Sequence, residues 1–538
     1  MGELSQEMTM SHGSDPHCLL LPYPAQGHVN PFMQLGKRLA SLGVRVTVAI
    51  TQHIHAKILL AQPLSAAAAA AAAPLQPNFQ TLPIQDGLPP DFDREVWSQD
   101  LKNTFDTTLA DGALQLLRTF ASQGHPVTCI IGDFFLRWTW SVAQKAAVPE
   151  YIFWPQNASI FSIYLHEHDI VASGYDPFEG NVRATVSREA TSMELITCIP
   201  GLTTPIHPVD LPFECPYGKR ALHWVRDVMR ERFNRMGEVR GVIANSFEAL
   251  EPEVVKALKL EFQQSKPHPQ YNHCWPRSSL PLRLVGPLVP NAVVAGDAHG
   301  ITGGSDELRS GGSFWKEEVE ECKEWLDAQP AASVLFVAFG SVMSLSAAQV
   351  QEVAKGLEAS RRKCLWVLRE KAITKKAING GEDTASMMGD KRRFVALEEA
   401  LPEGFVEQNQ QRCKVVRWAP QALVLSHPAV GGFFSHCGWN STLESLCCGV
   451  PLLGWPWLLD QVTNCWLASH VWKVGLTLER DEDNQTSRKY VESGVRQLME
   501  GPLATSLRAK ARHLRALARQ AAQRDDVIVS LVEDIHSL

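Results

Sequence analysis

The chain has 538 residues, more than one hydrophobic core accommodates, because single cores stop growing at roughly 250–300 residues. A hydrophobic share of 45% with 20% charged residues is ordinary for a globular protein, so folded domains are expected rather than disorder. The net charge of −7, from 51 basic and 58 acidic residues, provides no basic surface for nucleic acid. These numbers indicate two domains and a small-molecule partner.

Neither the start of the chain nor its later segments suggest a membrane. Residues 1–17 are polar and lack the apolar core of a secretory signal. No later stretch approaches the roughly 20 uninterrupted apolar residues of a spanning helix. The 12 cysteines include no C-x-x-C pair, so reduced, mostly buried thiols are expected. We therefore predict a cytoplasmic protein without an integral membrane segment.

The first elements of the chain form a strand, a helix and a second strand. Residues 18–23 are a short apolar run, and apolar residues alternate over 44–50 as in a strand. Between them, Asn30 is expected to cap a helix, with Pro31 in its first turn and Gly43 after its end. This order is the βαβ unit from which parallel sheets are built.

The alternation of strands and helices continues along the chain. Further strands are expected at residues 127–131, 242–245, 334–339, 364–368, 414–416, 430–434 and 451–454. A helix over 346–357 has a capping box in which Ser346 pairs with Gln349. Residues 289–314 are rich in small and polar residues without a hydrophobic period, and are interpreted as a linker. The sequence thus predicts an α/β protein of two doubly wound parallel-sheet domains.

Ligands of open parallel sheets bind beyond the carboxyl ends of the strands. In the first half this rule points to His28, which follows the first strand, and to Asp133, which follows the strand ending at Ile131. Histidine suits a general base because its pKa lies near neutrality, and a carboxylate at its other ring nitrogen would fix the tautomer and stabilise the imidazolium. We predict that His28 and Asp133 form such a pair.

In the second half the same rule points to Ser341, and to a segment from Ser435 to Ser441 that precedes a helix beginning near Asn440. Unpaired amides at a helix start bind anions, Gly438 lets a ligand approach the backbone, and His436 adds a donor. Alternatively, Asn440 and Ser441 only cap the helix.

The segment from Trp418 to Gln461 resembles the signature box of plant family 1 UDP-glycosyltransferases, which is also 44 residues long. The resemblance is carried by Trp418-Ala419-Pro420-Gln421, His427, Gly431, Phe433, His436-Cys437-Gly438-Trp439-Asn440-Ser441, Glu444, Gly449-Val450-Pro451 and Asp460-Gln461. Shorter stretches also look like that family, in its order: residues 24–31, 132–134, 245–248, 285–288 and 339–341. The similarity covers nearly the whole chain.

Membership of that family implies a GT-B fold, in which two Rossmann-like domains face each other. Residues 1–288 would form the acceptor-binding domain, 289–314 the linker and 315–520 the UDP-sugar-binding domain. A final helix over 521–538 would pack back on the first domain. The protein is expected to act as a monomer, with UDP-glucose as co-substrate and without a cofactor.

The resemblance also assigns contacts with the donor nucleotide. Trp418 would stack on uracil, with backbone hydrogen bonds from Ala419, while Gln421 and Glu444 would hold the ribose diol. The backbone at Gly438 and four side chains would bind the diphosphate: Ser341, His436, Asn440 and Ser441. Three residues would read the sugar hydroxyls: Trp439, Asp460 and Gln461. Taken singly, Trp418 could be a core residue, Asp460 a loop cap and Glu444 part of a solvated helix face.

In the predicted reaction, His28 deprotonates an acceptor hydroxyl that attacks the anomeric carbon in line, which inverts it and yields a β-glucoside. We expect the helix near Asn440 and the imidazole of His436, rather than a metal ion, to stabilise the leaving UDP. The box ends with glutamine at position 461, as it does in members of the family that resemble this chain and use glucose. The alternatives are a non-catalytic sugar-nucleotide-binding protein and another GT-B chemistry, such as an epimerase or a phosphorylase.

The acceptor is expected to be small and lipophilic: a phenolic, a flavonoid, a terpenoid or a hormone. Aromatic residues that could surround a flat ligand, or else belong to the core, are Phe153, Trp154, Phe161, Phe213, Tyr217 and Trp224.

Overall fold

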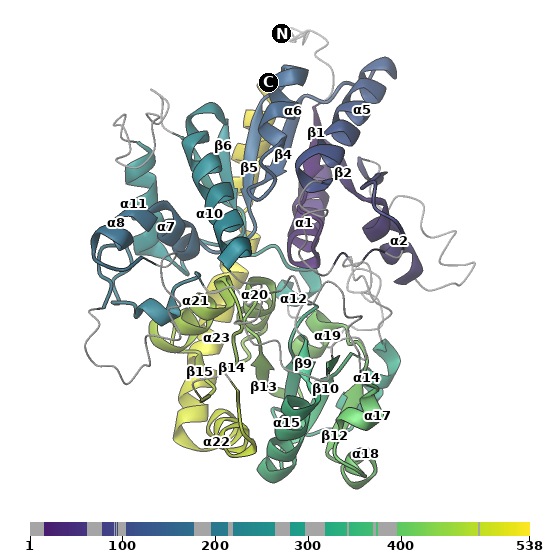
Figure 1. Cartoon of the computed structure of the whole chain (residues 1–538), viewed down its shortest axis with the longest axis vertical. Coiled ribbons are helices and arrows are strands. Elements are labelled where there is room, and N and C mark those ends of the chain that lie inside the picture. The colour runs from purple at the N-terminus through teal and green to yellow at the C-terminus, as the bar shows by residue number, and fades with distance from the viewer. Residues whose placement is uncertain are drawn as a thin grey trace, which may run out of the picture.

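A computed structural model of the chain shows two α/β layers stacked along the long axis of the molecule (Figure 1). It describes residues 16–61, 78–90, 92, 94, 104–176, 195–213, 219–263, 280–295, 318–341, 344–369, 373–374, 395–481 and 485–538. We call the part that carries the upper sheet of Figure 1 the first domain and the part that carries the lower sheet the second domain.

The sheet of the first domain has seven strands, all parallel, in the order β3-β2-β1-β4-β5-β6-β7. Its strands are β1 (His17–Leu21), β2 (Arg45–Thr51), β3 (Phe79–Ile84), β4 (Cys129–Asp133), β5 (Glu150–Trp154), β6 (Gly241–Ala244) and β7 (Leu282–Leu284). Strands β2 and β3 lie on one side of β1, and the chain then returns to place β4 on the other side of β1. Side chains after β1 and β4 therefore meet at the point where ligands of such sheets bind.

The sheet of the second domain has six parallel strands in the order β12-β10-β8-β13-β14-β15. They are β8 (Val334–Ala338), β10 (Lys363–Val367), β12 (Cys413–Val416), β13 (Val430–Ser435), β14 (Leu452–Gly454) and β15 (Gly475–Thr477). A separate two-stranded sheet pairs β9 (Leu345–Ser346) with β11 (Ile373–Thr374). Here the order reverses between β8 and β13, so the loops after these two strands are adjacent.

Helices cover both sheets. Those of the first domain are α1 (Gln26–Ser41), α2 (Gln52–Ala61), α5 (Leu109–Ser122), α6 (Thr139–Ala146), α7 (Ala158–Leu165), α8 (Glu167–Ala172), α10 (Lys219–Asn234) and α11 (Pro252–Phe262). Those that follow are α12 (Asn291–Ala295), α14 (Val319–Asp327), α15 (Ala347–Ser360), α17 (Leu397–Ala400), α18 (Phe405–Gln408), α19 (Gln421–Ser426), α20 (Trp439–Cys448), α21 (Asp460–Trp466), α22 (Arg488–Met499), α23 (Gly501–Gln523) and α24 (Asp526–His536). None of the helices in the described residues has the length and apolar composition needed to cross a bilayer.

The predicted strands and the cap of α15 are confirmed, but the predicted start of α1 is wrong. Ser346 Oγ accepts a hydrogen bond of 3.2 Å from the backbone N–H of Gln349, but the Gln349 side chain bonds the backbone of Thr486, so the reciprocal half of the capping box is replaced by that contact. Helix α1, in contrast, begins at Gln26, because the carbonyl of Ala25 already accepts hydrogen bonds from the amides of His28 and Val29. Pro31 consequently lies inside the helix. His28 is therefore held in a helical turn instead of in a free loop.

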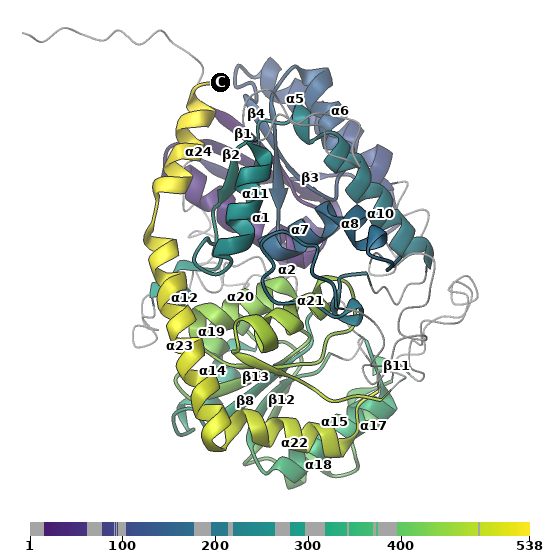
Figure 2. The same ribbon diagram turned by 90° about the vertical axis from the view of Figure 1, so that its left-hand side faces the viewer.

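The C-terminal helices connect the two domains. Figure 2 shows α23 beside the second domain and α24 continuing beside the first. One face of α24 is buried through Ile528, Leu531, Val532 and Ile535, which belong to the same apolar cluster as residues of β1 and α1, and the helix contacts β7. Asp534 also forms ion pairs with Arg240 at 3.1 Å and Arg283 at 3.0 Å. The end of the chain is thereby anchored on the first domain.

The beginning of the predicted linker is part of the packed structure. Helix α12 contacts α19, α20 and α23, and Val293 is 1% exposed. Residues 289–295 therefore do not behave as a solvated linker. The remainder of the predicted linker, 296–314, lies outside the described residues.

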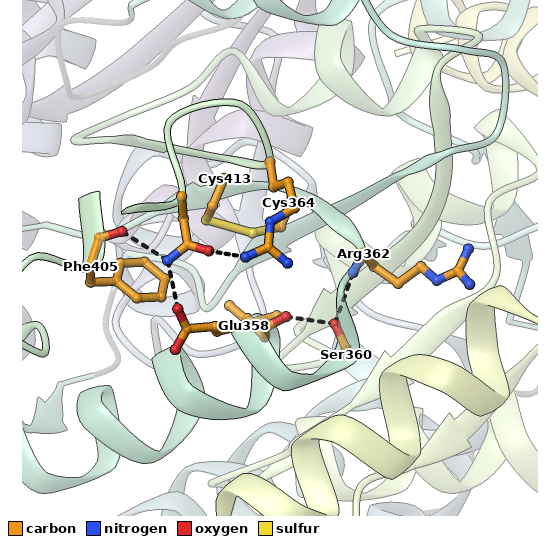
Figure 3. The surroundings of a disulfide bond; sticks show 9 residues. Glu358, Ser360, Arg362, Cys364, Phe405 and Cys413 are labelled. Carbon is orange, nitrogen blue, oxygen red and sulfur yellow. Dashed lines mark hydrogen bonds between the residues drawn. A yellow bond between two sulfur atoms is a disulfide. The ribbon is translucent and has the colours of Figure 1, made fainter. Parts of the chain in front are cut away.

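The expectation that all cysteines are reduced is wrong for one pair. Cys364 of β10 and Cys413 of β12 are direct neighbours in the parallel register, and the structure joins them in a disulfide (Figure 3). Cys18 and Cys129 are also paired across β1 and β4, with their Sγ atoms 3.1 Å apart, but remain free. The pairing arises from sheet register between residues 49 apart in sequence, so no spacing motif indicates it.

Candidate active site

His28 and Asp133 lie together at the carboxyl ends of β1 and β4. The Nδ1 atom of His28 is 2.9 Å from Oδ2 of Asp133, whose side chain is completely buried. The Asp133 carboxylate also accepts hydrogen bonds from the backbone amides of Tyr23 at 3.1 Å and Phe135 at 3.0 Å. With its Nδ1–H donated to Asp133, His28 keeps a lone pair on Nε2 for an incoming proton.

Aromatic rings surround the imidazole of His28. Its centroid lies 5.1 Å from that of Tyr23 and 5.3 Å from that of Phe135, and the Tyr23 ring lies 6.4 Å from that of Trp224. Four of the aromatic residues considered from the sequence are instead buried core residues: Phe153, Trp154, Phe161 and Phe213. Tyr217 lies outside the described residues. Tyr23 and Phe135, which the sequence analysis missed, directly follow β1 and β4 and could have been found by that position.

In the second domain, His436 lies between two glycines on neighbouring loops. A Cβ atom on either Gly340 or Gly438 would come within 2.6 Å of the His436 Nε2 atom, and Gly340 has a φ of 74° that favours glycine. Burial lowers the pKa of His436 to about 4, so the ring is neutral at pH 7. Its Nδ1 atom is buried without a hydrogen-bond partner. Ser341 follows Gly340 on the same loop.

Helix α20 begins next to this imidazole, and the interpretation of Asn440 and Ser441 as mere caps is wrong. The N-cap position is Gly438, which has no side chain. Asn440 Nδ2 donates instead to the carbonyl oxygen of Gly27 at 2.9 Å, and Ser441 Oγ accepts from Gln421 Nε2 at 2.9 Å. Asn440 therefore contacts the residue that precedes His28, which brings the predicted base and the predicted anion site next to each other across the boundary between the domains.

Three of the four residues predicted to hold the nucleoside, Trp418, Ala419 and Gln421, line one pocket at the end of the second sheet, and the fourth, Glu444, is hydrogen-bonded to Gln421. Its lining consists of Phe336, Ala338, Phe339, Gly340, Leu345, Val367, Leu368, Arg369, Trp418, Ala419 and Gln421. Trp418 is half-buried at this pocket, which rules out the core interpretation. Gln421 Nε2 donates to Glu444 Oε2 at 2.7 Å. Burial raises the pKa of Glu444 to about 7, so it is not a residue of a solvated helix face.

The three residues predicted to read the sugar differ in their placement. Asp460 follows Leu459, which has a φ of 46°, and its carboxylate accepts from Asn464 Nδ2 at 2.9 Å. Burial raises the pKa of Asp460 to about 6, while the nearby His28 lowers it. Gln461 Oε1 accepts from the amide of Trp457 at 3.1 Å.

Trp439 is placed differently from the prediction. Its indole is 3% exposed and donates through Nε1 to the carbonyl oxygen of Asn245 in the first domain, at 2.8 Å. The side chain therefore forms a contact between the domains, and only the backbone amide, at the start of α20, faces the site. That amide donates to the Asp460 carboxylate.

A second feature missed in the sequence is a buried polar contact between the domains. Asn157, Asp210, Thr463 and Asn464 are all at most 5% exposed. Asn157 Nδ2 donates to Asn464 Oδ1 at 2.6 Å, and Thr463 Oγ1 donates to the carbonyl oxygen of Asp210 at 2.8 Å. The i,i+4 spacing from Asp460 to Asn464 places both on one helix face, which is a signal for Asn464. No sequence pattern points to Asn157.

Known proteins resemble this chain over most of its length. A family model described as UDP-glucoronosyl and UDP-glucosyl transferase matches residues 311–506. UDP-glycosyltransferase 85A7 from Arabidopsis thaliana is 32% identical over 94% of this chain and 93% of its own length. The 7-deoxyloganetin glucosyltransferase from Gardenia jasminoides is also 32% identical, over 94% of both chains.

Solved structures show the same fold. Os79 from O. sativa in complex with UDP has 26% identity and a TM-score of 0.71, and the match covers 97% of this chain and 99% of that chain. Phytolacca americana UGT2, complexed with UDP-2fluoro-glucose and pterostilbene, has 26% identity, a TM-score of 0.68 and the same coverage. The predicted GT-B fold is thus confirmed, and the chain belongs to the plant family 1 UDP-glycosyltransferases.

Proposed function

We propose that this enzyme transfers glucose from UDP-glucose to a hydroxyl of a small lipophilic acceptor, with inversion, to give a β-glucoside. One observation supports the proposal: the 2.9 Å hydrogen bond from Asn440 to Gly27 joins the start of α20 to the residue before His28, which is itself paired with Asp133. A base from one domain can then act on a sugar whose diphosphate is bound by the other. The proposed site thus combines a base for the acceptor with a binding site for the donor, as a group transfer requires.

In the proposed reaction, His28 Nε2 removes the proton of the acceptor hydroxyl as its oxygen attacks the anomeric carbon. Asp133, already bonded to Nδ1 at 2.9 Å, stabilises the imidazolium that forms. The new C–O bond forms on the face of the anomeric carbon opposite to the C–O bond that breaks. The electron pair of the breaking bond leaves with UDP. In-line displacement on an α-linked sugar yields the β-anomer.

The departing UDP gains negative charge, which needs stabilisation. Three kinds of donor suit this position. They are the first backbone amides of α20, the neutral imidazole of His436 and the side-chain amide of Asn440. Ser341 and Ser441 are proposed to complete the diphosphate site. We propose that these groups act without a metal ion or a cofactor, as the signature box suggests.

The choice of glucose rests on Gln461 and on relatives, among them the 7-deoxyloganetin glucosyltransferase. A planar, apolar acceptor suits the neighbouring rings of Tyr23 and Phe135 beside His28, and the Phytolacca americana relative was solved in complex with pterostilbene. A monomeric, cytoplasmic enzyme remains part of the proposal. A crocetin glucosyltransferase from Gardenia jasminoides that is 30% identical is named chloroplastic, so location needs its own test.

The test is a transfer assay with the purified full-length protein. UDP release is measured with UDP-glucose, UDP-galactose and UDP-glucuronic acid against phenols, flavonoids and terpenoid alcohols, and the product anomer is determined by NMR. Glucose transfer giving β-glucosides is expected. UDP binding without transfer to any acceptor would favour the alternative of a sugar-nucleotide-binding protein, and an α-glycoside would rule out inversion.

A further inference from the structure

Asn464 uses every hydrogen-bonding group of its side chain at the boundary between the domains. Its Nδ2 atom donates to the carbonyl oxygen of Cys437 at 3.0 Å and to Oδ2 of Asp460 at 2.9 Å. Its Oδ1 atom accepts from Asn157 Nδ2 at 2.6 Å. The side chain is completely buried. A carboxamide has two N–H donors and one carbonyl oxygen, so these three bonds define a single orientation of the amide.

The two segments that Asn464 joins are both strained. Cys437 has a φ of 63° and Leu459 a φ of 46°, although neither is glycine. Such conformations cost about 1–3 kcal/mol each and persist only where the surroundings hold them. The hydrogen bond to the Cys437 carbonyl holds the first segment, and the bond to Asp460 holds the residue directly after the second. Asn464 thereby ties the loop before α20 to the start of α21.

Asn157 brings the first domain into this arrangement. It follows β5, and its Oδ1 atom accepts from the amide of Ile160 at 2.9 Å as the N-cap of α7. Its carbonyl oxygen accepts from Trp154 Nε1 at 2.8 Å. Because these bonds fix the Asn157 side chain, its Nδ2 atom points to Asn464 whenever the two domains are in contact.

We propose that Asn464 is a positioning residue that orients the Asp460 carboxylate toward the donor sugar, and that Asn157 makes this orientation depend on contact between the domains. The inference rests on the proposed function, because it takes Asp460 to bind the sugar. Separating the domains removes the Asn157 donor from Asn464 Oδ1. Neither Asn464 nor Asn157 lines the nucleoside pocket at Trp418 and Gln421, so UDP should depend on this contact less than UDP-glucose does.

The experiment compares the affinities of UDP and UDP-glucose by titration calorimetry, with the full-length protein and no acceptor. Asn464→Ala should weaken binding of UDP-glucose about tenfold more than binding of UDP, the magnitude of one hydrogen bond to a charged group; any loss common to both ligands reports the Cys437 bond, which supports the proposed diphosphate loop. Asp460→Ala should also weaken UDP-glucose more than UDP. The ratio of the two affinities in the double variant should be no more altered than in Asp460→Ala, because both substitutions remove the same contact with the sugar.

Asn157→Ser serves as a second variant far from the nucleotide, since serine keeps the helix cap and removes the donor. It should weaken UDP-glucose binding selectively, by a smaller factor than Asn464→Ala. Thr463→Val is the matched control: it removes the neighbouring hydrogen bond between the domains, to Asp210, but leaves Asp460 and Cys437 untouched. It should not change the ratio of the two affinities.

Three outcomes overturn the inference: equal losses for UDP and UDP-glucose in Asn464→Ala and Asn157→Ser, additive changes of the affinity ratio in the double variant, or the same selective loss in Thr463→Val. Failure of the proposed function is distinguishable. Unchanged UDP-glucose affinity in Asp460→Ala would sink the assignment of Asp460 to the sugar, whereas an effect of Asp460→Ala without one of Asn464→Ala would sink the positioning role alone.

Discussion

The side-chain amide of Asn440 donates to the backbone carbonyl of Gly27, and the two residues belong to opposite domains. Asn440 lies in the first turn of α20, and Gly27 precedes His28 in the first turn of α1. Two helix N-termini, each after a central strand of its sheet, therefore meet at the boundary between the domains. A nucleotide sugar held at α20 would present its anomeric carbon to the imidazole of His28.

Replacing His28 by alanine should abolish transfer and spare donor binding. The loss in kcat should be at least about a hundredfold, the contribution of a positioned general base. UDP affinity, measured by calorimetry, should stay within about twofold, because the nucleoside pocket lies entirely in the second domain. Transfer at a near-normal rate in His28→Ala would show that another group is the base.

Asp133→Asn keeps the size of the side chain but removes its charge. The imidazolium that forms during attack would lose its anionic partner, so kcat should fall about a hundredfold or more, with little change in UDP affinity. The bond from the Phe135 amide can persist, because an asparagine oxygen also accepts. A large loss of UDP binding, with kcat preserved, would place Asp133 in a different role.

Glu444→Gln should raise stability at alkaline pH. The pKa of Glu444 is raised from an ordinary value of 4.5 to about 7, so its contribution to stability is complete below pH 4.5 and is lost as the pH rises through 7. The glutamine variant should have a higher melting temperature than the natural protein at pH 8, and a similar one at pH 4.5.

Glu352→Gln provides a control of opposite sign. Hydrogen bonds from Arg488 lower the pKa of Glu352, so this carboxylate stabilises the fold above its ordinary pKa. Its replacement should lower the melting temperature at pH 8. If Glu444→Gln also lowered the melting temperature at pH 8, the Glu444 carboxylate would not be destabilised by burial.

Gly340→Ala tests the contact between His436 and the diphosphate. The new methyl group would come within 2.6 Å of the His436 ring, at a φ of 74°, and should displace the imidazole. Gly43→Ala is matched for backbone strain, since Gly43 has a φ of 91° but open space around it. Both variants should lose about 1–2 kcal/mol of stability, and only Gly340→Ala should lose UDP affinity. Unchanged UDP binding in Gly340→Ala would argue against His436 as a diphosphate ligand.

Local patterns in the sequence predict most of the elements and both halves of the site. Apolar runs mark β1, β4, β8 and β13, and the residues after these strands include His28, Asp133, Ser341 and His436. These predictions succeed because burial on both faces makes parallel strands uniformly apolar, and because ligands bind at the carboxyl ends of such strands. Helix boundaries were less predictable: Asn30 resembles a cap, yet the tight turn after β1 starts α1 at Gln26.

The sequence alone determined the fold class and the family, and it indicated the residues proposed for acid–base chemistry and donor binding, because these signals depend on neighbours within a few positions of the chain. Only the tertiary structure decided which distant residues meet: Cys364 with Cys413, Trp439 with Asn245, and Asn464 with Asn157. Register between strands and contact between domains create these pairs. Such contacts leave no periodic trace in the sequence, since each partner alone satisfies ordinary rules of burial and capping.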